Sequence, residues 1–544
     1  MGSATTELRE GAPIASGRRR LRVTVQLSAW WQPAWICGAV ELMAAEHDLS
    51  LVVAPPDHAE PAPDTRREKL STPLSRWFHR FDRRILLDPD AFQLVDLQPL
   101  AERLGLTPTP ADAGPVADVV VDFTGEAGVA DAVRPRAGIW RVQVGAIGLE
   151  PAGTWEVLAG NPITRSTIAV RETARSPERL CWPTYLGTDP VSVRRSRNGA
   201  HWKAGLHLAH ALRACADELP APVVEPDRVV PGAAALDRRV LGWSGRYAGV
   251  KWRERSAREQ WCLAYHLDAA AGGSAGGSPH GVIADYTTLA PPPDRLWADP
   301  FPVGAGSDHL VFFEEQRFDS PRAHIAVADI DAAGRVFPGR PVLERPYHLS
   351  YPFVFSYQGT HFMIPETADN RTIELYRASR FPDEWTLERV MLRDIFAVDA
   401  TLWQEGARWW LFAGVGIPGA EVWDDLCIFT SDSPLGEWQP HPRNPVKSDV
   451  RCSRPAGNLF VQDGALYRPA QICVPRYGYG IALQRVDRLD QTGYAESEVT
   501  RLLPDPRRGM IGVHTMNRTG RLSVIDWQRH LRRPLREIVR PGIA

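Results

Sequence analysis

The sequence predicts two domains of different class, an α/β domain of Rossmann type over residues 21–216 and an all-β five-bladed β-propeller over residues 241–535. Three observations carry this prediction. The chain has 544 residues, more than one hydrophobic core usually supports. Apolar strands alternate with helical stretches in the first two hundred residues, and strand–turn–strand units recur in the second half.

The α/β prediction rests on short buried strands separated by helices, the pattern of a parallel, doubly wound sheet. The expected strands are Leu21–Leu27, Leu49–Ala54, Ala117–Phe123 and Gly138–Val144, and the expected helices are Ala34–Glu46 and Trp202–Cys215. Residues 1–20 resemble a disordered tail. Residues 217–240 are rich in Pro, Ala and Val without a helical period, which predicts a linker.

The propeller prediction rests on five units that share a turn glycine between two apolar strands. These glycines are Gly306, Gly359, Gly406, Gly464 and Gly520. A strand-built period of about fifty residues is typical of propeller blades, which bury their faces by stacking around an axis.

Composition excludes several classes of protein. The formal net charge is −2, which favours neither nucleic acid nor an anionic membrane as the main partner. No apolar run is long enough for a transmembrane helix, and no apolar core follows the N-terminal arginines as in a signal peptide, so a cytoplasmic protein is expected. The seven cysteines form no CxxC pair, so neither a zinc site nor a disulfide framework, and no other metal site, is expected. Oligomeric state stays open.

Register within the repeat singles out carboxylates for the centre of the propeller. Asp299 and Asp399 each lie seven residues before a turn glycine, and Glu366 ends the second strand of the second unit. Paired carboxylates in a confined site suit glycosidic chemistry, in which one activates a nucleophile and the other protonates the leaving group. The alternative is that these residues cap strands or turns.

Four further residues are candidates for substrate binding. Arg454 and Arg468 flank the fourth unit and could hold a phosphate or carboxylate, or pair with the carboxylates. His514 is a candidate proton carrier or a structural histidine. Trp297, one of nineteen tryptophans, is a stacking platform for a sugar or part of the core.

Six short motifs resemble the N-terminal domain of plant glucosamine inositolphosphorylceramide transferases and its bacterial relatives over roughly residues 240–530. They are Trp297-Ala-Asp-Pro-Phe, Ile364-Pro-Glu, Asp399-Ala-Thr-Leu, Tyr477-Gly-Tyr-Gly, Tyr494-Ala-Glu and Gly512-Val-His-Thr. That domain looks like the five-bladed propellers of arabinanase-type and invertase-type enzymes. The resemblance implies that Asp299 is a base and Asp399 a pKa modulator. The general acid of those enzymes, a Glu on the fourth blade, is missing from Ser453-Arg-Pro-Ala-Gly-Asn.

The first domain resembles formyltransferases of the methionyl-tRNA and amino-sugar type through Gly138-Ile-Trp-Arg-Val-Gln-Val-Gly and the stretch from Gly153 to Ile168. The catalytic Asn and His of that family fall near Arg141 and Gln143. Neither side chain can act as a general base at neutral pH, so formyl transfer is not expected. A domain that binds a donor, or one that only braces the propeller, is left open.

Together these observations favour a carbohydrate-active enzyme that transfers a glycosyl group to a glycoconjugate or metabolite. A nucleotide-sugar donor, with Mg²⁺ or Mn²⁺, is the cofactor alternative, and the substrate is a glycan or small molecule. A propeller-type glycoside hydrolase with Glu366 as acid, and a non-catalytic carbohydrate-binding or scaffold protein, are the other two hypotheses.

Overall fold

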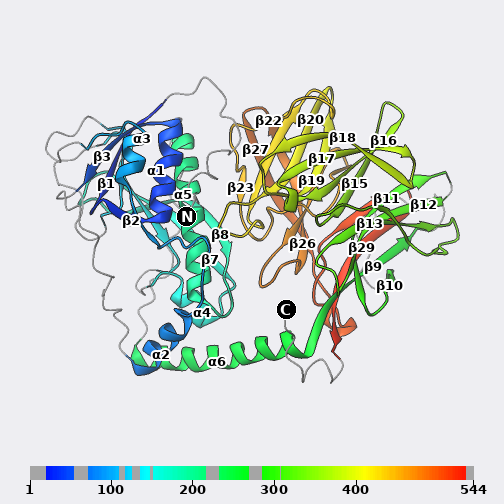
Figure 1. Ribbon diagram of the computed structural model, residues 1–544, viewed down its shortest axis with the longest axis horizontal. Coiled ribbons are helices and arrows are strands. Elements are labelled where there is room, and N and C mark those ends of the chain that lie inside the picture. Colours follow the sequence, from blue (N-terminus) through cyan, green and yellow to red (C-terminus); the bar gives the residue numbers. More distant parts are fainter. Residues whose placement is uncertain are drawn as a thin grey trace. The chain divides into compact units, whose positions relative to one another are not determined.

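The computed structural model describes residues 20–53, 72–108, 117–124, 135–146, 151–215, 232–268, 285–306 and 308–533. Nearly all of the tail predicted over residues 1–20, and residues 217–231 of the predicted linker, lie outside these ranges. The chain divides into two compact units, residues 1–248 with 417–421 and residues 249–416 with 422–544. Figure 1 shows helices and a sheet in the first unit and strands almost throughout the second.

A six-stranded sheet forms the centre of the first unit, in the order β3-β1-β5-β6-β7-β8. Its strands are β1 (Arg22–Leu27), β3 (Asp48–Val53), β5 (Val119–Asp122), β6 (Ile139–Val144), β7 (Ile163–Arg171) and β8 (Arg179–Gly187). A separate pair joins β2 (Trp31–Pro33) to β4 (Leu94–Asp96). The four strands expected from the sequence are confirmed as β1, β3, β5 and β6.

The sheet is mixed, whereas the sequence predicted a parallel one. Strands β3, β1, β5 and β6 run parallel, but β7 and β8 continue the sheet antiparallel. The short connection between β7 and β8 accounts for the antiparallel pairing of these two strands only, because a parallel pair needs a crossover of a dozen or more residues. The Rossmann-type, formyltransferase-like assignment of this unit stays a prediction.

Two helices and one face of the sheet build the core of the first unit. They are α1 (Ala34–Glu46) and α5 (Val193–Cys215), which begins earlier than the sequence predicted. Val23, Val121 and Trp140 on the strands pack with Met43 and Leu208 in this cluster. Burying such side chains removes apolar surface from water, the main favourable term in folding.

Four more helices belong to the described chain: α2 (Pro73–Asp82), α3 (Gln98–Arg103), α4 (Thr154–Ala159) and α6 (Ala233–Ser256). Helix α6 occupies residues predicted as the end of the linker and the start of the propeller, so the described part of that linker is helical. Among the residues that the structure describes, no helix combines the length and hydropathy that crossing a bilayer requires.

The second unit contains five sheets, and four of them are built from consecutive strands. The first sheet contains β11 (Arg295–Ala305), β12 (Asp308–Arg317), β13 (Ala323–Ile330) and β14 (Arg340–Leu343), and the second contains β15 (Ser350–Tyr357), β16 (Thr360–Thr367), β17 (Thr372–Arg380) and β18 (Glu384–Arg393). The third contains β19 (Ala397–Glu405), β20 (Arg408–Val415), β21 (Asp425–Ser431), β22 (Gln439–Pro440) and β23 (Lys447–Ser448). The fourth contains β24 (Phe460–Gln462), β25 (Ala465–Ile472), β26 (Gly480–Asp490) and β27 (Gly493–Leu502). These are blades one to four of the five-bladed β-propeller.

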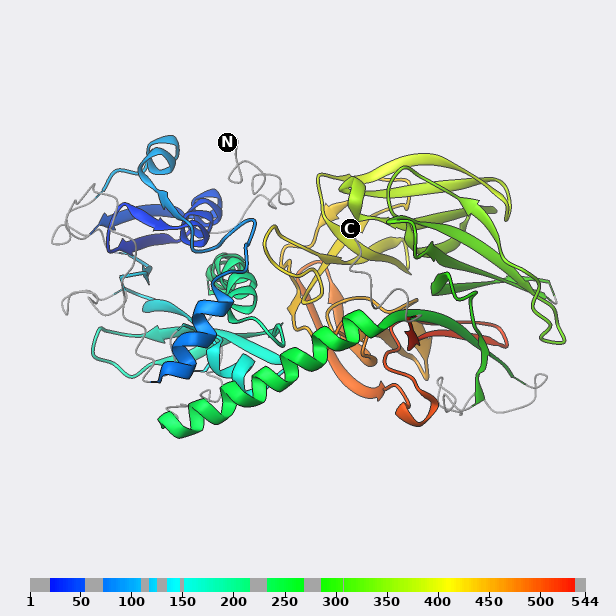
Figure 2. The ribbon, with the colours of Figure 1, turned by 60° about the horizontal axis from the view of Figure 1, so that its bottom comes forward.

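The fifth blade joins strands from both ends of the unit, in the order β10-β9-β29-β28. Strands β9 (Ala257–Leu267) and β10 (Thr287–Leu289) precede the first blade, and β28 (Met516–Thr519) and β29 (Leu522–Arg532) follow the fourth. The antiparallel pairing of β9 with β29 runs from Ala257–Arg532 to Leu267–Leu522. This pairing closes the ring, because it joins the start and the end of the propeller's sequence in one blade. Figure 2 shows the blades from a second direction.

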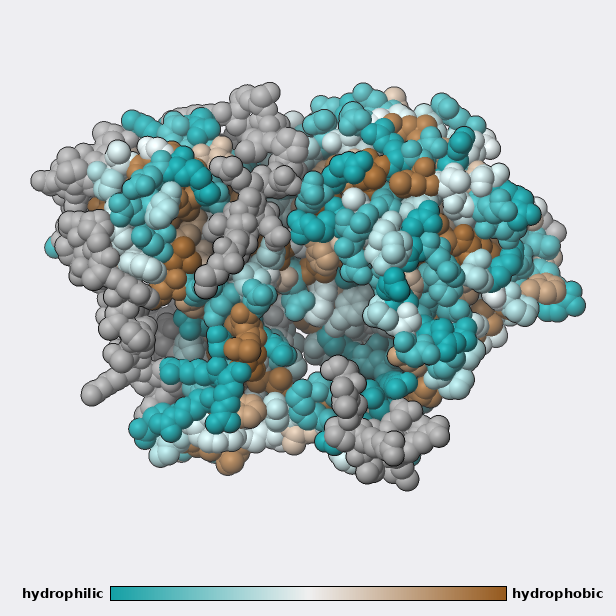
Figure 3. Space-filling model, viewed as in Figure 1, coloured by the Kyte–Doolittle hydropathy of each residue, from teal (hydrophilic) through white to brown (hydrophobic). Residues whose placement is uncertain are grey.

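Polar groups dominate the face seen in Figure 3, where hydrophobic residues form only small, separated patches over the propeller. The apolar side chains of this unit instead fill the spaces between blades. One such cluster joins Phe312 and Val327 of blade one to Tyr376 of blade two and Phe429 of blade three.

Candidate functional site at the propeller centre

The first strand of each of the first three blades carries a β-bulge at the same depth. The bulges place Asp299, Tyr351 and Asp399 at equivalent positions, with φ values of 52°, 44° and 54°. A left-handed backbone costs a residue other than glycine about 1–3 kcal/mol and recurs at functional sites. A bulge also re-aims the side chain, here toward neighbouring blades.

This equivalence confirms the shared register predicted for Asp299 and Asp399. In blade two, however, the residue at this position lies one place earlier in the sequence than predicted. Gly306 and Gly406 are the first residues of their two-residue hairpin loops, whereas Gly359 is the second. Counting back from the glycine therefore reaches Pro352 in blade two, while the equivalent residue is Tyr351.

Tyr351 ties four blades together at the centre. Its backbone N–H donates to Asp299 Oδ2 at 3.2 Å. Its hydroxyl lies 2.9 Å from Thr401 Oγ1 of blade three and accepts the N–H of Gly457 of blade four at 2.7 Å. The ring is fully buried. These bonds hold the first strands close together, so the carboxylates beside them have fixed positions.

Asp399 is held by Arg454 and Gln471 of blade four. Arg454 Nε donates to Asp399 Oδ2 at 2.5 Å and Nη2 donates to Oδ1 at 3.2 Å, a bidentate pair. Gln471 Nε2 donates to Oδ2 at 2.8 Å. Arg454 also faces the ring of Tyr477 at 4.9 Å from its centroid. Of the two hypotheses for Arg454, this geometry matches the one in which it pairs with the carboxylates.

Glu366 also lies beside Arg454, with Oε2 3.6 Å from Arg454 Nη2. That oxygen is buried and makes no hydrogen bond in the described part of the chain. Burial raises the pKa of Glu366 to about 8, and Asp399 adds to this effect while Arg454 and His348 oppose it. At neutral pH the carboxyl group is mostly protonated and can donate a proton.

Asp299 lies between blades one, two and five. Its Oδ1 accepts the hydroxyl of Thr515 at 2.6 Å and lies 3.7 Å from His514 Nε2. Burial raises the pKa of Asp299 to about 7, because the charged form loses its hydration, although His514 opposes the effect. A carboxyl group of this pKa is available as a general base near neutral pH.

His514 is oriented by Asp526, whose Oδ2 lies 2.6 Å from His514 Nδ1. The imidazole stacks on Trp261 with 3.9 Å between ring centroids. Burial alone would lower the pKa of His514, but Asp526 and Asp299 outweigh burial and raise it to about 9. The imidazolium therefore faces Asp299 at neutral pH.

Asp299, His514 and Asp526 also lie close enough to suggest a cation site, since their ligand atoms fall within 4.8 Å of one another. Their hydrogen bonds do not fit one. Asp526 Oδ1 accepts the N–H groups of His514 and Thr515, and Oδ2 accepts that of Asp299. These donors occupy the carboxylate that would have to face a metal ion, so no step is assigned to a metal here.

Arg468 lies away from this cluster, inside blade four. It is fully buried and donates to both carboxylate oxygens of Glu496 and to the carbonyl oxygens of Cys452 and Ser453. Lys447 bonds to the same glutamate at 2.6 Å. This network fastens the 452–453 segment to the blade, so the structure gives Arg468 a structural position.

Trp297 also takes part in packing. Its Nε1 donates to Glu315 Oε2 at 2.6 Å, and its ring meets Phe313 edge to face. It belongs to a cluster with Leu263 of blade five. Sequence reasoning brought Asp299, Asp399, Glu366, Arg454 and His514 to one site. It missed Tyr351, Gln471 and Trp261, for which no local sequence signal existed.

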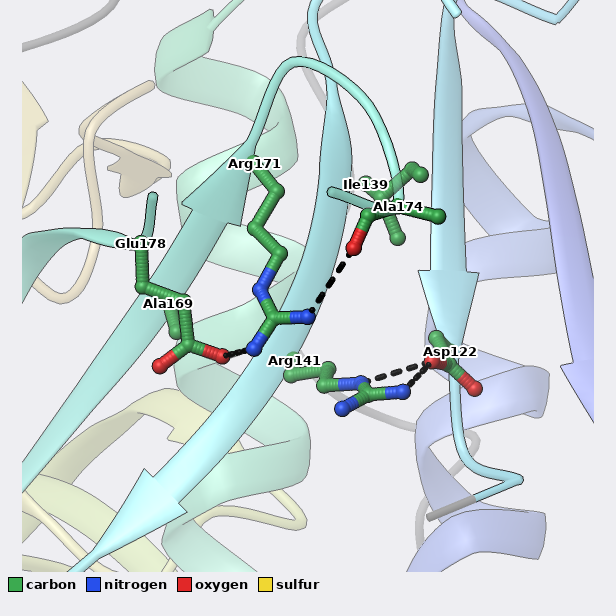
Figure 4. A pocket seen from close by; sticks show the side chains of 7 residues that line it. All are labelled: Asp122, Ile139, Arg141, Ala169, Arg171, Ala174 and Glu178. Carbon is green, nitrogen blue, oxygen red and sulfur yellow. Dashed lines mark hydrogen bonds and ion pairs between the residues drawn. The ribbon is translucent and has the colours of Figure 1, made fainter. Parts of the chain in front are cut away.

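The first unit has a separate small pocket of about 50 Å³ on its sheet, shown in Figure 4. Arg141 Nε donates to Asp122 Oδ2 at 2.6 Å, and Gln143 Nε2 donates to Glu178 Oε2 at 2.8 Å. Arg171 forms an ion pair with the same glutamate. The two positions expected to replace a catalytic Asn and His are thus tied to carboxylates.

Residues 282–529 match the family model described as glucosamine inositolphosphorylceramide transferase 1, N-terminal. The rice protein named glucosamine inositolphosphorylceramide transferase 1 (Oryza sativa subsp. japonica) is 37% identical over 221 residues, which are 40% of this chain and 30% of that protein. The Arabidopsis thaliana protein of the same name is 35% identical over 220 residues, which are 40% and 29% of the two chains. The chain thus spans less than a third of these relatives.

Two solved structures resemble part of the chain. A family 117 glycoside hydrolase of Zobellia galactanivorans has a TM-score of 0.33 and 11% identity, and covers 50% of this chain and 91% of its own. An exo-1,5-α-L-arabinanase from a bovine ruminal metagenomic library has a TM-score of 0.31 and 14% identity, and covers 43% and 96%. By sequence, the segment that builds most of the propeller and its central cluster is similar to the N-terminal domain of glucosamine inositolphosphorylceramide transferases.

Proposed function

We propose that the propeller centre transfers a glycosyl group to a hydroxyl group of a glycoconjugate acceptor. The observation that carries this proposal is the pair of buried carboxyl groups, Asp299 and Glu366, whose pKa values are raised to about 7 and about 8. Two carboxyl groups with raised pKa values, one near neutral pH and one above it, can supply a base and an acid in one site.

In the proposed reaction, Asp299 accepts the proton of the acceptor hydroxyl as its oxygen bonds to the anomeric carbon. The bond from that carbon to the leaving-group oxygen breaks, and Glu366 donates its proton to that oxygen. Asp399 positions Arg454, which holds positive charge beside Glu366. His514 stabilises the carboxylate form of Asp299 from the other side.

The relatives are named as transferases that act on inositolphosphorylceramide. A phosphoinositol-type glycolipid headgroup is therefore the first acceptor class to test, with a nucleotide sugar as donor. No arginine is assigned to donor phosphates, since Arg454 is paired with Asp399 and Arg468 is enclosed by Glu496 and backbone carbonyls.

Hydrolysis is the second candidate, because the same two carboxyl groups would serve with water in place of the acceptor. Purified protein would be incubated with a panel of nucleotide sugars, with and without Mg²⁺ or Mn²⁺, and with aryl glycosides. Thermal unfolding would report binding, and product analysis would separate transfer from release.

Asp299→Asn and Glu366→Gln should remove the chemistry, while Asp463→Asn, at an exposed hairpin turn of blade four, should leave it intact. Release of free sugar in the absence of an acceptor would show that the site hydrolyses its substrate, and the transfer proposal would be wrong. Ligand binding without turnover in the wild type, weakened in Asp299→Asn, would support the binding-only alternative.

A further inference from the structure

Helix α2, which Figure 1 labels, presents basic and aromatic residues that play no part in the propeller site. Arg76, Arg80 and Arg84 are exposed and follow one another at four-residue spacing, which places them on one side of the helix and its C-terminal turn. Trp77 is 49% exposed beside them, and Leu86 is 91% exposed just beyond.

The opposite side of α2 is fixed to the first unit, so this face cannot turn inward. Phe78 is fully buried and meets Trp243 of α6 at 4.7 Å between ring centroids. Thr72 caps the helix by accepting the N–H of Ser75 at 3.1 Å. The helix is therefore a rigid support for the arginines.

Charge on this face is of one sign. The only acidic residue of α2, Asp82, is buried and accepts the Ser192 hydroxyl at 2.7 Å and the N–H of Arg194 at 2.8 Å. Within the described chain, Arg76, Arg80 and Arg84 have no ion pair. Like charges at this spacing destabilise a helix slightly, and an anionic surface would relieve that repulsion.

We infer that the surface made of Arg76, Trp77 and Arg80 of α2 and of Arg84 and Leu86 in the segment that follows the helix docks on a membrane surface that contains anionic lipids. Arginines beside a tryptophan and an extended leucine match the headgroup boundary of a bilayer, where cations meet phosphates and apolar tips enter the acyl region. Nucleic acid would use the arginines but leave Leu86 in water. The inference is independent of the proposed chemistry, because α2 lies outside the propeller.

The test is flotation of the full-length protein with vesicles of phosphatidylcholine alone or mixed with phosphatidylserine. Binding should require phosphatidylserine and weaken as salt shortens the Debye length from about 10 Å at 0.1 M to about 3 Å at 1 M. The combined change Arg76→Gln, Arg80→Gln, Arg84→Gln should weaken binding on the order of a hundredfold, since each basic residue near the surface contributes roughly a fivefold gain.

The matched control is Arg335→Gln, Arg380→Gln, Arg488→Gln, which removes the same charge from exposed arginines of the propeller. It should bind like the wild type. Leu86→Ser should weaken binding several-fold without changing its salt dependence. Circular dichroism would verify that each variant is folded.

Three results would overturn the inference: no binding to phosphatidylserine vesicles, equal loss in both triple variants, or binding of single-stranded RNA that depends on the α2 arginines while vesicles are ignored. Each can be observed whether or not the protein transfers a sugar.

Discussion

Asp299 and Asp399 occupy equivalent positions in blades one and three, yet their surroundings give them different roles. Asp399 receives a bidentate arginine and an amide, so its oxygens are occupied. Asp299 receives one hydroxyl and one backbone N–H and faces an imidazolium at a longer distance. Asp299 thus accepts two hydrogen bonds, both from neutral groups, whereas Asp399 accepts three, two of them from Arg454.

The raised pKa values of Asp299 and Glu366 predict a bell-shaped pH profile for the proposed transfer. Activity should rise as pH increases through about 7, where Asp299 loses its proton, and fall through about 8, where Glu366 loses its own. A pH–rate profile with the active donor and acceptor would show both limbs.

Asp299→Asn and Glu366→Gln should each lower turnover by about 10²–10⁴-fold, the usual contribution of a general acid or base. The acid limb should disappear in Asp299→Asn and the alkaline limb in Glu366→Gln. If the pH–rate profile of either variant kept both limbs, the limb expected to disappear would belong to another titratable group.

His514 makes a separate prediction about stability. Its folded-state pKa of about 9 exceeds the ordinary value of 6.5, so the folded protein binds this proton more tightly than the unfolded chain. The stabilisation is complete below pH 6.5 and is lost as pH rises through 9. Urea unfolding should show this decline in the wild type and a smaller one in His514→Gln; equal slopes would contradict the assignment.

At the scale of elements, the turn glycines predicted five strand pairs but not their register. Gly359 and Gly464 are the second residues of their loops, and Gly306, Gly406 and Gly520 are the first. Both kinds of two-residue turn need a left-handed residue, and the sequence does not say which loop position takes the glycine. Asp299 and Asp399 were found because their loops are of one kind, and Tyr351 was missed because its loop is of the other.

The role of Arg468 shows a second limit of sequence analysis. Its partner Glu496 lies on β27, and the segment that it fastens lies before β24, so the network depends on the fold of the whole blade. The local sequence around an arginine does not show whether its side chain faces a carboxylate cluster or is enclosed by its own blade. Only the pairing of β25, β26 and β27 separates them.

Gly457 tests how closely blades four and five approach each other. A Cβ atom there would lie 2.1 Å from the carbonyl oxygen of Met516, and φ is 132°. Gly457→Ala should therefore destabilise the protein by about 3 kcal/mol or more, because backbone must move. Gly464→Ala is the control, since φ is 76° but the space is open, and should cost about 1 kcal/mol. Similar unfolding midpoints for both variants would mean that the approach is looser than described.

At the scale of the whole molecule, ring closure rather than any single blade should set the stability of the propeller. Strand β9 enters the last blade between β10 and β29, so residues 257–267 hold the first and last parts of the propeller together. The sequence predicted five units but not this closure, because β9 lies before the first repeat and lacks its turn glycine. A strand that joins two distant parts of a chain leaves no periodic signal.

Ala264→Pro tests this closure. Ala264 is buried on β9 and pairs with Ile525 on one side and Thr288 on the other, so proline there removes a ladder hydrogen bond from a central strand and costs roughly 3 kcal/mol. Thr288→Pro, on the exposed edge strand β10 directly opposite, is the control and should cost about 1 kcal/mol. Hydrogen exchange in mild denaturant should accelerate across all five blades of Ala264→Pro, because an open ring loses the packing between its first and last blades. If faster exchange were confined to β9, β10, β28 and β29, each blade would be stable independently of ring closure. The central site would then not need the closed ring to hold Asp299 close to His514.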